Sequence, residues 1–303
     1  MISAKPVSLS PAGLFSLKTK ISLCIAVVFW ASAFVGIRIG LESYSPGSLA
    51  LFRFLIASAC MGVLYWRMDK RVIFPRKDFC LLLLFGVFGI SFYNVFLNYG
   101  EVSVAAGTAS FMISQSPLMG MVLAVIFLGE KFNPATLFGI LISILGVGLI
   151  ALTQDHDVKF DIGMVYILLA TIVSGLHSVM QKFFLKRYHA LDVTVFIIWG
   201  GTVGLLIYLP ELWHDLQAAS LKATLAVIYL GIFPAAIAYV AWGYALAAIP
   251  VSQCTSFLYF MPVIATLLGW VFLNEVPMLL SLIGGLIALL GVWVANRAFI
   301  KGG

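Results

Sequence analysis

The sequence predicts an all-α membrane protein of ten transmembrane helices, built as two inverted five-helix repeats. Three observations lead to this fold class. Of the 303 residues, 62% are hydrophobic and only 10% are charged, whereas a soluble domain carries about 25% charged residues. The apolar residues are gathered in ten runs, each about as long as a helix that crosses a bilayer. The second half of the chain also repeats the first.

The ten runs predict the helices in order and leave little chain for a soluble domain. The first run is too long for the apolar core of a cleaved secretion signal, so we interpret it as an uncleaved span. The runs cover residues 21–41, 46–66, 79–98, 103–128, 135–153, 162–181, 193–210, 221–247, 251–273 and 278–296.

The repeat runs at a constant offset of 145 residues. Residues 117–151 align with 262–296 without a gap, and the phrase FLGE at 127–130 returns as FLNE at 272–275. A match of this length is typical of a duplicated fold. Because each copy holds five spans, the second copy must cross the membrane in the opposite sense. Inverted repeats are typical of secondary transporters, whose substrate site lies between the halves.

The distribution of charge predicts the orientation of the chain in the membrane. With a cytoplasmic N-terminus, only Arg38, Lys159 and Lys222 among the basic loop residues fall outside, as the positive-inside rule requires. The net charge of +6 is therefore a topology signal and does not indicate nucleic-acid binding. We predict an integral protein of the bacterial inner membrane with both termini cytoplasmic. Its segments are a cytoplasmic segment 1–20, a first repeat 21–153, an outside loop 154–161, a second repeat 162–298 and a cytoplasmic tail 299–303.

Short motifs in both halves resemble the EamA-type family of the drug/metabolite transporter superfamily. The motifs are Pro117, LGE (128–130), GILISILGV (139–147), Pro262, LNE (273–275), GGLIALLGV (284–292), FWASAFVGIR (29–38) and LFRFLIA (51–57). The resemblance covers nearly the whole chain. It implies ten helices, cytoplasmic termini, a central cavity made by spans one to four and six to nine, and peripheral spans five and ten. Asn274 departs from the glycine that the family pattern usually has, which affects a helix terminus.

Polar side chains inside the apolar runs are the first candidates for the substrate site. Arg53 in span two could hold a carboxylate with its fork of donors, and the alternative is a structural or interfacial role. His177, in the middle of span six, shares a helix face with Gln181. Histidine titrates near physiological pH, so His177 could bind substrate or accept a proton; the alternative is a packing histidine.

Amides and hydroxyls in spans three and four form the second group. Asn94 and Asn98 lie one helical turn apart, and Ser114 and Gln115 follow in the next span. An amide that faces lipid is left without hydrogen bonds, so these side chains are expected to face the protein interior. Contact with substrate and hydrogen bonds between helices both remain open for them.

Aromatic residues complete the cavity candidates. Tyr239 and Trp242 in span eight and Tyr259 in span nine are near-counterparts of the polar positions in the first half. Trp30 and Phe34 share one face of span one. Because Trp30 is too deep for an interfacial belt, it is expected either to line the cavity or to pack in the core.

Two prolines occupy equivalent places in spans four and nine. Pro117 and Pro262 each remove a backbone donor and predict a helix kink. Paired interruptions in corresponding helices point to the binding region of a transporter, and a kink that merely repeats with the fold is the alternative.

The sequence also excludes several chemistries. It has no nucleotide-binding loop, no metal-ligand motif and no cysteine framework, so we predict no cofactor and no metal. All twelve Asp and Glu residues fall at predicted helix ends or in loops. That argues against a carboxylate proton relay and leaves His177 as the central candidate for proton coupling.

The predicted function is a secondary transporter that exports small organic metabolites, with no enzymatic activity. Within the resemblance, amino acids are the expected substrates. The partners are then a small-molecule substrate and the lipid bilayer, without nucleic acid, and a homo-oligomer is left open. The alternative is a sugar or nucleotide-sugar carrier of the same superfamily, which should have a more basic cavity. A membrane enzyme acting on lipid-linked substrates is a remote alternative.

Overall fold

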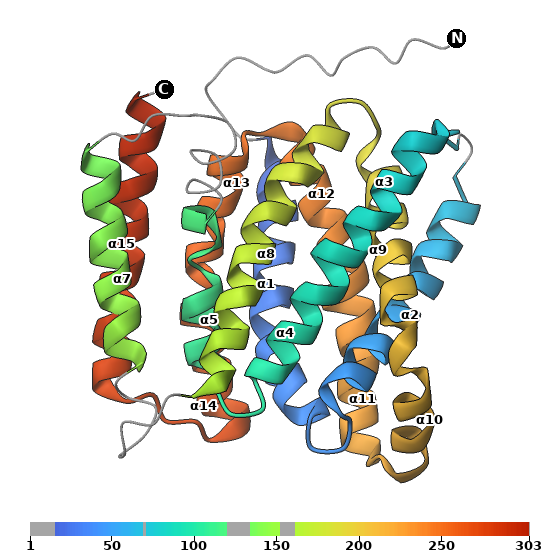
Figure 1. The fold of residues 1–303 in the computed structure, drawn as a ribbon, viewed down its shortest axis with the longest axis horizontal. Helices are drawn as coiled ribbons and strands as arrows, with labels where there is room; N and C mark the ends of the chain where they lie inside the picture. The colour runs from blue at the N-terminus through green and yellow to red at the C-terminus, as the bar shows by residue number, and fades with distance from the viewer. Residues whose placement is uncertain (1–15, 69–70, 120–133, 152–160, 303) are drawn as a thin grey trace.

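A computed structural model of the chain describes residues 16–68, 71–119, 134–151 and 161–302. In these residues the backbone forms helices and short links, without strands, which confirms the all-α fold class (Figure 1). The first half contains α1 (Leu17–Gly40), α2 (Pro46–Trp66), α3 (Arg76–Gly86), a π-helical segment (Val87–Phe92), α4 (Tyr93–Gly100), α5 (Ala106–Ile113) and α7 (Pro134–Ala151). The second half contains α8 (Ile162–Leu185), α9 (Ala190–Leu205), a 3₁₀ turn (Leu206–Tyr208), α10 (Leu209–Ala218), α11 (Leu221–Leu230), a π-helical segment (Gly231–Ile237), α12 (Ala238–Ala248), α13 (Val251–Ser256), a 3₁₀ segment (Phe257–Phe260), α14 (Met261–Leu273) and α15 (Leu279–Gly302).

Within the described ranges, seven continuous helical stretches are long and apolar enough to cross a membrane. Shorter apolar stretches lie in α7 and α15, at Leu137–Leu149 and Leu279–Ala295. The fourth predicted span, 103–128, is described only as far as residue 119. The predicted segment 1–20 and the outside loop 154–161 lie mostly outside the described residues.

Polar residues start several of these helices. The Ser45 hydroxyl accepts a hydrogen bond from the Ser48 amide before α2, and Pro46 follows at the first helical position, where no amide donor is needed. The Ser220 hydroxyl caps α11 in the same way through the Ala223 amide. These caps place the links between apolar segments and thereby fix where each helix begins.

The helices run between two ends of the bundle, which we call upper and lower as they appear in Figure 1. The lower end holds the links 41–45, 101–105, 219–220 and 274–278, and the upper end holds the links 186–189 and 249–250. Helix α1 begins and α15 ends at the upper end (Figure 1).

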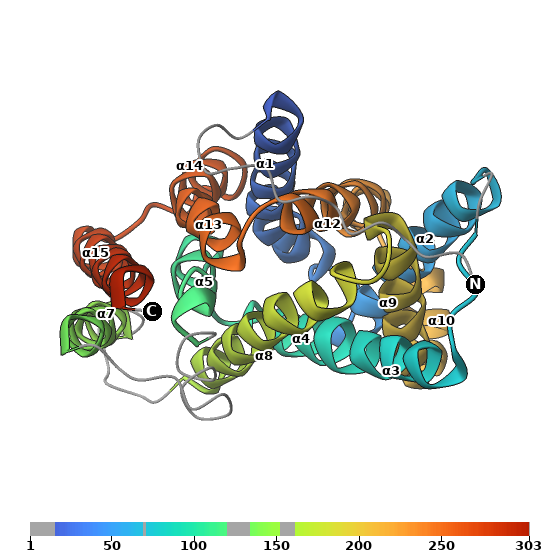
Figure 2. The ribbon, with the colours of Figure 1, turned by 90° about the horizontal axis from the view of Figure 1, so that it is seen from above.

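Helices α7 and α15 pack against each other at one side of the bundle (Figure 2). Their glycines let the two backbones touch, because a methyl group added at Gly146 would lie 2.3 Å from the Ala288 nitrogen. One added at Gly291 would lie 2.3 Å from the Ser143 nitrogen. Gly291 and Ala288 are the residues 145 positions after Gly146 and Ser143. Each contact therefore has its image under the inverted repeat, and the two spans are peripheral, as the resemblance implied.

The main hydrophobic core lies among the other helices. Leu49, Phe54 and Ile90 are completely buried there together with Leu230. The core joins α1, α2 and the α3–α4 stretch of the first half to α8, α9, α11 and α12 of the second. A cavity at its centre is lined by residues of both repeats.

Candidate functional site: a central cavity and its closed lower end

Two irregular backbone segments at equivalent positions border the centre of the molecule. The π-helical segments begin at Val87 and Gly231, 144 residues apart. Pro234 lies inside the second one, and its carbonyl accepts a hydrogen bond from the Trp30 indole at 3.1 Å. π-Helical turns interrupt the regular backbone hydrogen bonding of an α-helix and are frequent at functional sites.

Spans four and nine are also interrupted at equivalent depth. Helix α5 stops at Ile113, and the regular helix is broken at Ser114 and Gln115 before the chain reaches Pro117. In the second half the 3₁₀ segment separates α13 from α14 just ahead of Pro262. The Ser114 hydroxyl donates to the Leu258 carbonyl at 3.2 Å, so the two interruptions touch across the repeats.

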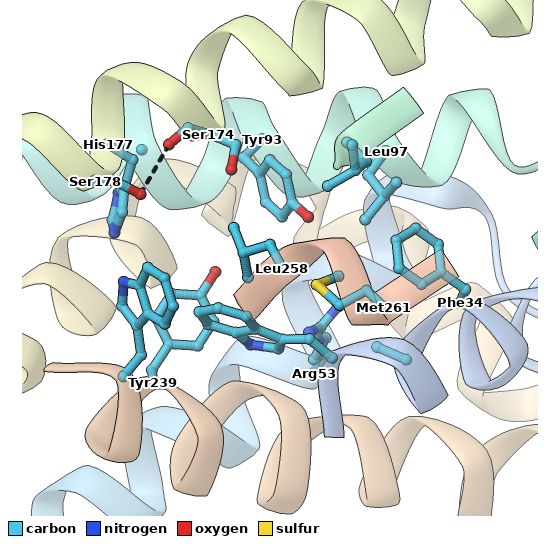
Figure 3. Close-up of a pocket in the computed structure, with 15 residues that line it drawn as sticks. Phe34, Arg53, Tyr93, Leu97, Ser174, His177, Ser178, Tyr239, Leu258 and Met261 are labelled. Carbon is cyan, nitrogen blue, oxygen red and sulfur yellow. Dashed lines mark hydrogen bonds between the residues drawn. The ribbon is translucent and has the colours of Figure 1, made fainter. Parts of the chain in front are cut away.

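The cavity between these elements is small. It measures about 50 Å³, whereas pockets that hold small molecules typically measure about 300–1,000 Å³. A metabolite can enter only if the surrounding helices move. Its lining is Trp30, Ala33, Phe34, Arg53, Gly89, Tyr93, Leu97, Ile113, Ser174, His177, Ser178, Tyr239, Trp242, Leu258 and Met261 (Figure 3).

Arg53 supplies the positive charge of the cavity. The side chain is 3% exposed, and its Nη1 donates to Oδ1 of Asn94 at 3.1 Å. Asn94 is itself fixed, because its Nδ2 donates to the Ile90 carbonyl at 2.8 Å. Nε of Arg53 has no hydrogen-bond partner among the described residues. The guanidinium is therefore held in place by Asn94, and its Nε–H remains able to donate a hydrogen bond to a ligand.

Aromatic rings stand around the same cavity. The Trp30 ring packs 5.4 Å from Tyr239 and 5.1 Å from Trp242, measured between ring centroids. Phe34 and Tyr93 also line the wall. Ring faces attract organic cations, so an arginine and a cluster of rings together can hold the two opposite charges of a zwitterion.

His177 is buried between the halves. Its ring stacks on Phe85 with centroids 4.8 Å apart and meets the edge of Tyr239 at 6.3 Å. Neither ring nitrogen has a hydrogen-bond partner in the part of the chain that is described. A methyl group at Gly89 would lie 2.1 Å from Nδ1, so the glycine in the π-helical segment makes room for the histidine.

The cavity brings together six of the twelve cavity candidates: Trp30, Phe34, Arg53, His177, Tyr239 and Trp242. Asn94 is just behind Arg53. Asn98 donates to the Pro46 carbonyl at 2.9 Å, and Ser114 joins the two helix interruptions. These three side chains make contacts between or within helices, the alternative that the sequence left open.

The remaining candidates lie away from the cavity lining. Gln115 accepts a hydrogen bond from the Ser143 hydroxyl of α7, and Tyr259 packs beside the small cluster that includes Leu118 and Val292. Gln181 is 1% exposed on α8. Helical spacing predicts that such side chains face inward, and it does not decide which neighbour they meet.

Sequence reasoning missed several apolar lining residues, namely Leu97, Leu258 and Met261. They look like any other residue of an apolar run, and the signal available was position: Leu258 and Met261 flank the interruption before Pro262. It also missed that Glu101, in the link after α4, would be buried.

An ion pair closes the lower end between the repeats. Nε of Arg38, at the end of α1, donates to Oε1 of Glu275 at 3.2 Å. Its Nη1 donates to the carbonyls of Glu101 at 2.6 Å and Val102 at 3.1 Å. Oε2 of Glu275 accepts from the Ala106 amide at 3.0 Å, at the start of α5. One arginine and one glutamate thus tie α1 and α5 of the first repeat to the second.

Asn274 allows Glu275 to reach this position. It ends α14 with φ of 55°, in the left-handed region. That conformation favours glycine and, after it, asparagine. The asparagine at this helix terminus therefore performs the turn that a glycine would perform, and the chain doubles back toward α5.

Comparisons with known proteins agree with this architecture. The model of the EamA-like transporter family matches residues 17–152 and again 161–297. A protein of Streptantibioticus cattleyicolor named "Probable terminal-alkyne amino-acid exporter" is 39% identical over 277 residues, covering 91% of this chain and 92% of that protein. The transporter YdfC of Bacillus subtilis, described as uncharacterized, is 38% identical over 273 residues, with 90% and 89% covered.

A solved structure shows the same fold. It superposes with a TM-score of 0.68 over 93% of this chain and 98% of that one, at 18% sequence identity. The family match covers nearly all of both repeats and the relatives are named as transporters. The chain therefore belongs to the EamA-like transporter family and is an integral membrane transporter rather than an enzyme.

Proposed function

We propose that the protein exports amino acids or closely related zwitterions from the cytoplasm through the central cavity. The observation that carries this proposal is Arg53, a buried guanidinium beside a cluster of aromatic rings, whose Nε has no hydrogen-bond partner in the described part of the chain. A carboxylate would take the free donors of Arg53, and an ammonium would lie against the rings of Trp30, Tyr239 and Trp242. The relative named as an amino-acid exporter supports the same substrate class.

The distribution of charge supports a cytoplasmic upper end. Basic residues gather there in the described ranges, and they include Lys18, Lys20, Arg71, Lys77, Lys182, Lys186 and Arg297. Carboxylates gather at the lower end, among them Glu42, Asp161, Glu211, Asp215 and Glu275. By the positive-inside rule, both chain ends are cytoplasmic and the Arg38–Glu275 pair closes the outer face.

Alternating access fits the two-fold relation of the repeats. Near-equal halves give states of near-equal energy that open to opposite sides. In the state described here the lower end is tied and the cavity is too small for substrate. The π-helical segments and the interruptions before Pro117 and Pro262 supply the places where helices can bend as the cavity enlarges.

Paired substrates test the role of Arg53. Proteoliposomes would be loaded with an amino acid, and uptake of radiolabelled amino acid by exchange would be compared with competition by its decarboxylated amine. We expect Arg53→Met to weaken amino-acid competition about 10- to 100-fold, because a charge-assisted hydrogen bond contributes about 1.5–3 kcal/mol. The amine should lose little affinity for the same variant.

Arg187→Gln is the matched control, because Arg187 is an exposed arginine beside the Phe183 ring and is distant from the cavity lining. It should leave both ligands unchanged. Equal losses for acid and amine in Arg53→Met would contradict carboxylate recognition. A panel with a nucleotide sugar tests the alternative carrier, which the single arginine of the cavity disfavours.

A further inference from the structure

Glu101 is a carboxyl group hidden inside the closed lower end. It lies in the link between α4 and α5, outside the transmembrane helices, and its side chain is 0% exposed. Neither carboxyl oxygen has a hydrogen-bond partner in the described residues. Its backbone carbonyl, by contrast, accepts from Arg38. A buried ionised carboxylate without partners is very unfavourable, so the geometry suits the neutral, protonated acid.

The charges around Glu101 come from every side of the closure. Arg38 of α1, Arg53 of α2, Tyr93 of α4 and Glu275 after α14 all interact electrostatically with it. Burial raises the pKa of Glu101 well above its ordinary value, Glu275 adds to that shift, and the two arginines oppose it.

Asp161, just before α8, is another carboxylate near this link, and it is hydrogen-bonded to Ser103 and Gly163. Both of its carboxyl oxygens accept from the Ser103 hydroxyl, at 2.8 and 3.0 Å. One of them also accepts from the Gly163 amide at 2.8 Å. Among the described residues, both Glu275 and Glu101 interact with Arg38, the first through a hydrogen bond and the second electrostatically.

Arg38 carries a single positive charge, which two ionised carboxylates would have to share. Its guanidinium already holds Glu275 and two backbone carbonyls. If Glu101 ionises, it competes for Arg38 or draws water into the link, and either event weakens the Arg38–Glu275 pair. A hollow of about 310 Å³ beside Arg38 and Glu275, between α5, α14 and α15, reaches this cluster.

We propose that Glu101 is a proton-binding site that controls the closure of the lower end. With a proton on its carboxyl group the Glu101 side chain stays buried and Arg38 remains hydrogen-bonded to Glu275. When the proton leaves to water, the ionised Glu101 separates the pair and the lower end opens. The proton is thus a ligand of the closed state. The effect of this proton on the closure does not depend on which metabolite the cavity carries.

The sign of the pH dependence follows from this linkage. In the closed state the pKa of Glu101 is raised, and in an open, hydrated state it returns toward about 4.3. Below both values pH has no effect. Between them, each rise of one pH unit shifts the equilibrium up to about tenfold toward the open state. A rise in pH through this window therefore favours the open lower end, and a fall in pH favours the closed one.

Infrared titration of the wild-type protein in lipid nanodiscs tests the proton itself. The band of a protonated carboxyl group should persist to pH values well above those of an exposed carboxyl, and it should vanish in Glu101→Gln. Glu42→Gln is the matched control, because Glu42 is an exposed carboxylate at the same end, paired with Lys222. Its removal should leave the band. Absence of a high-pH band in the wild type would overturn the proposal.

Spin-label distances test the closure. Labels on Val102→Cys and Val276→Cys, two exposed positions on opposite sides of the ion pair, would be placed in a chain without its four native cysteines. The distance distribution should shift to longer values as pH rises, and Glu101→Gln should keep the short distance at every pH. A pH response that is unchanged in Glu101→Gln would overturn the proposal. The infrared result stands on its own if the labelled chain does not fold.

Discussion

The α7–α15 contact and the two ends of the bundle obey the inverted repeat to different degrees. Across α7 and α15 the repeat is kept closely, since a methyl group added at Gly146 would lie 2.3 Å from the Ala288 nitrogen and one added at Gly291 would lie 2.3 Å from the Ser143 nitrogen. At the ends the equivalent positions hold different chemistry. Lys182 stands 144 residues after Arg38, and Leu246 stands 145 residues after Glu101.

Arg38 and Lys182 nevertheless have one role in common, since both donate hydrogen bonds to backbone carbonyls. Arg38 donates to the carbonyls of Glu101 and Val102. Lys182 donates to the carbonyls of Leu246, Ala247 and Ile249. Both therefore satisfy the free carbonyls where a helix ends. Arg38 alone of the two also holds a carboxylate in the described part of the chain, namely Glu275.

This difference separates structure from function. A contact that only stabilises the fold can remain symmetric, because both repeats need it equally. The lower end departs from symmetry where it gains a link between the repeats and a buried acid. The bonds of Lys182 stay within the second repeat, whereas Arg38 adds to its bonds within the first repeat one bond that crosses to Glu275 of the second. The asymmetry therefore marks the lower end as the part that is tied in the present state.

The largest expected effect tests the symmetric region. Gly146→Ala and Gly291→Ala should each lower the free energy of unfolding by about 1–3 kcal/mol, because the added methyl overlaps backbone atoms that cannot move aside. The two losses should be similar, and thermal unfolding in detergent measures both.

Gly148→Ala is the control on the same helix, because nothing lies within 4 Å of the position of its Cβ. Alanine favours helix over glycine, so this variant should be neutral or slightly more stable. A much smaller loss for one of the two interface glycines would show that the two-fold relation does not extend to the energetics of α7 and α15.

A smaller effect is expected at the two basic residues. Arg38→Met leaves Glu275 without its counter-charge and unties the repeats, so exchange of substrate in proteoliposomes should fall about tenfold, equivalent to about 1.4 kcal/mol. The side chains of Arg38 and Glu275 are 31% and 20% exposed, and water limits the loss to this range. Lys182→Met should reduce exchange less, because it removes hydrogen bonds to carbonyls of its own repeat.

The measurement compares the rate of substrate exchange of these two variants in proteoliposomes of matched protein content. Thermal unfolding checks that both variants are folded. Equal loss of exchange for Arg38→Met and Lys182→Met would mean that the ion pair with Glu275 adds nothing, and that both residues act only as caps of helix ends.

Most of the fold follows from the sequence because its causes are local or repeated. Length and apolarity give the spans, and an odd number of spans per copy gives the inversion. The interruptions near Pro117 and Pro262 lie where the prolines indicate. The π-helical segment at Val87–Phe92 contains no proline, so its interruption of span three had no such signal. The part of span four after residue 119 and nearly all of the loop between spans five and six lie outside the described ranges.

The site was predicted only in part, because facing inward and lining a cavity are different properties. Trp30, Arg53 and His177 reach the cavity, whereas Gln115 turns to Ser143 of α7. Glu101 was set aside because it stands at a helix end, where a carboxylate normally meets water. Tertiary packing buries the Glu101 side chain, and no pattern along the chain carries that information.

The smallest expected effect concerns Tyr44 and Tyr188, which are equivalent at an offset of 144. The Tyr44 hydroxyl shares a hydrogen bond with Thr224 at 2.8 Å, and the Tyr188 hydroxyl donates to the carboxylate of Asp78. Hydrogen bonds to charged groups contribute more than neutral ones, and the partial exposure of Tyr188 reduces the difference. Tyr188→Phe should lower the free energy of unfolding by about 1 kcal/mol, and Tyr44→Phe by about half of that.

The contribution of the Tyr188–Asp78 hydrogen bond to stability should depend on pH in the alkaline range. Burial and the hydrogen bond to Asp78 raise the pKa of Tyr188 to about 12, above the ordinary value of about 10. The folded state therefore binds this proton more tightly than the unfolded state does, and the resulting stability is present below about pH 10 and lost as pH rises toward 12. Thermal unfolding between these pH values should show a smaller decline in Tyr188→Phe than in the wild type. An identical decline in both would mean that the Tyr188–Asp78 contact does not hold the upper end.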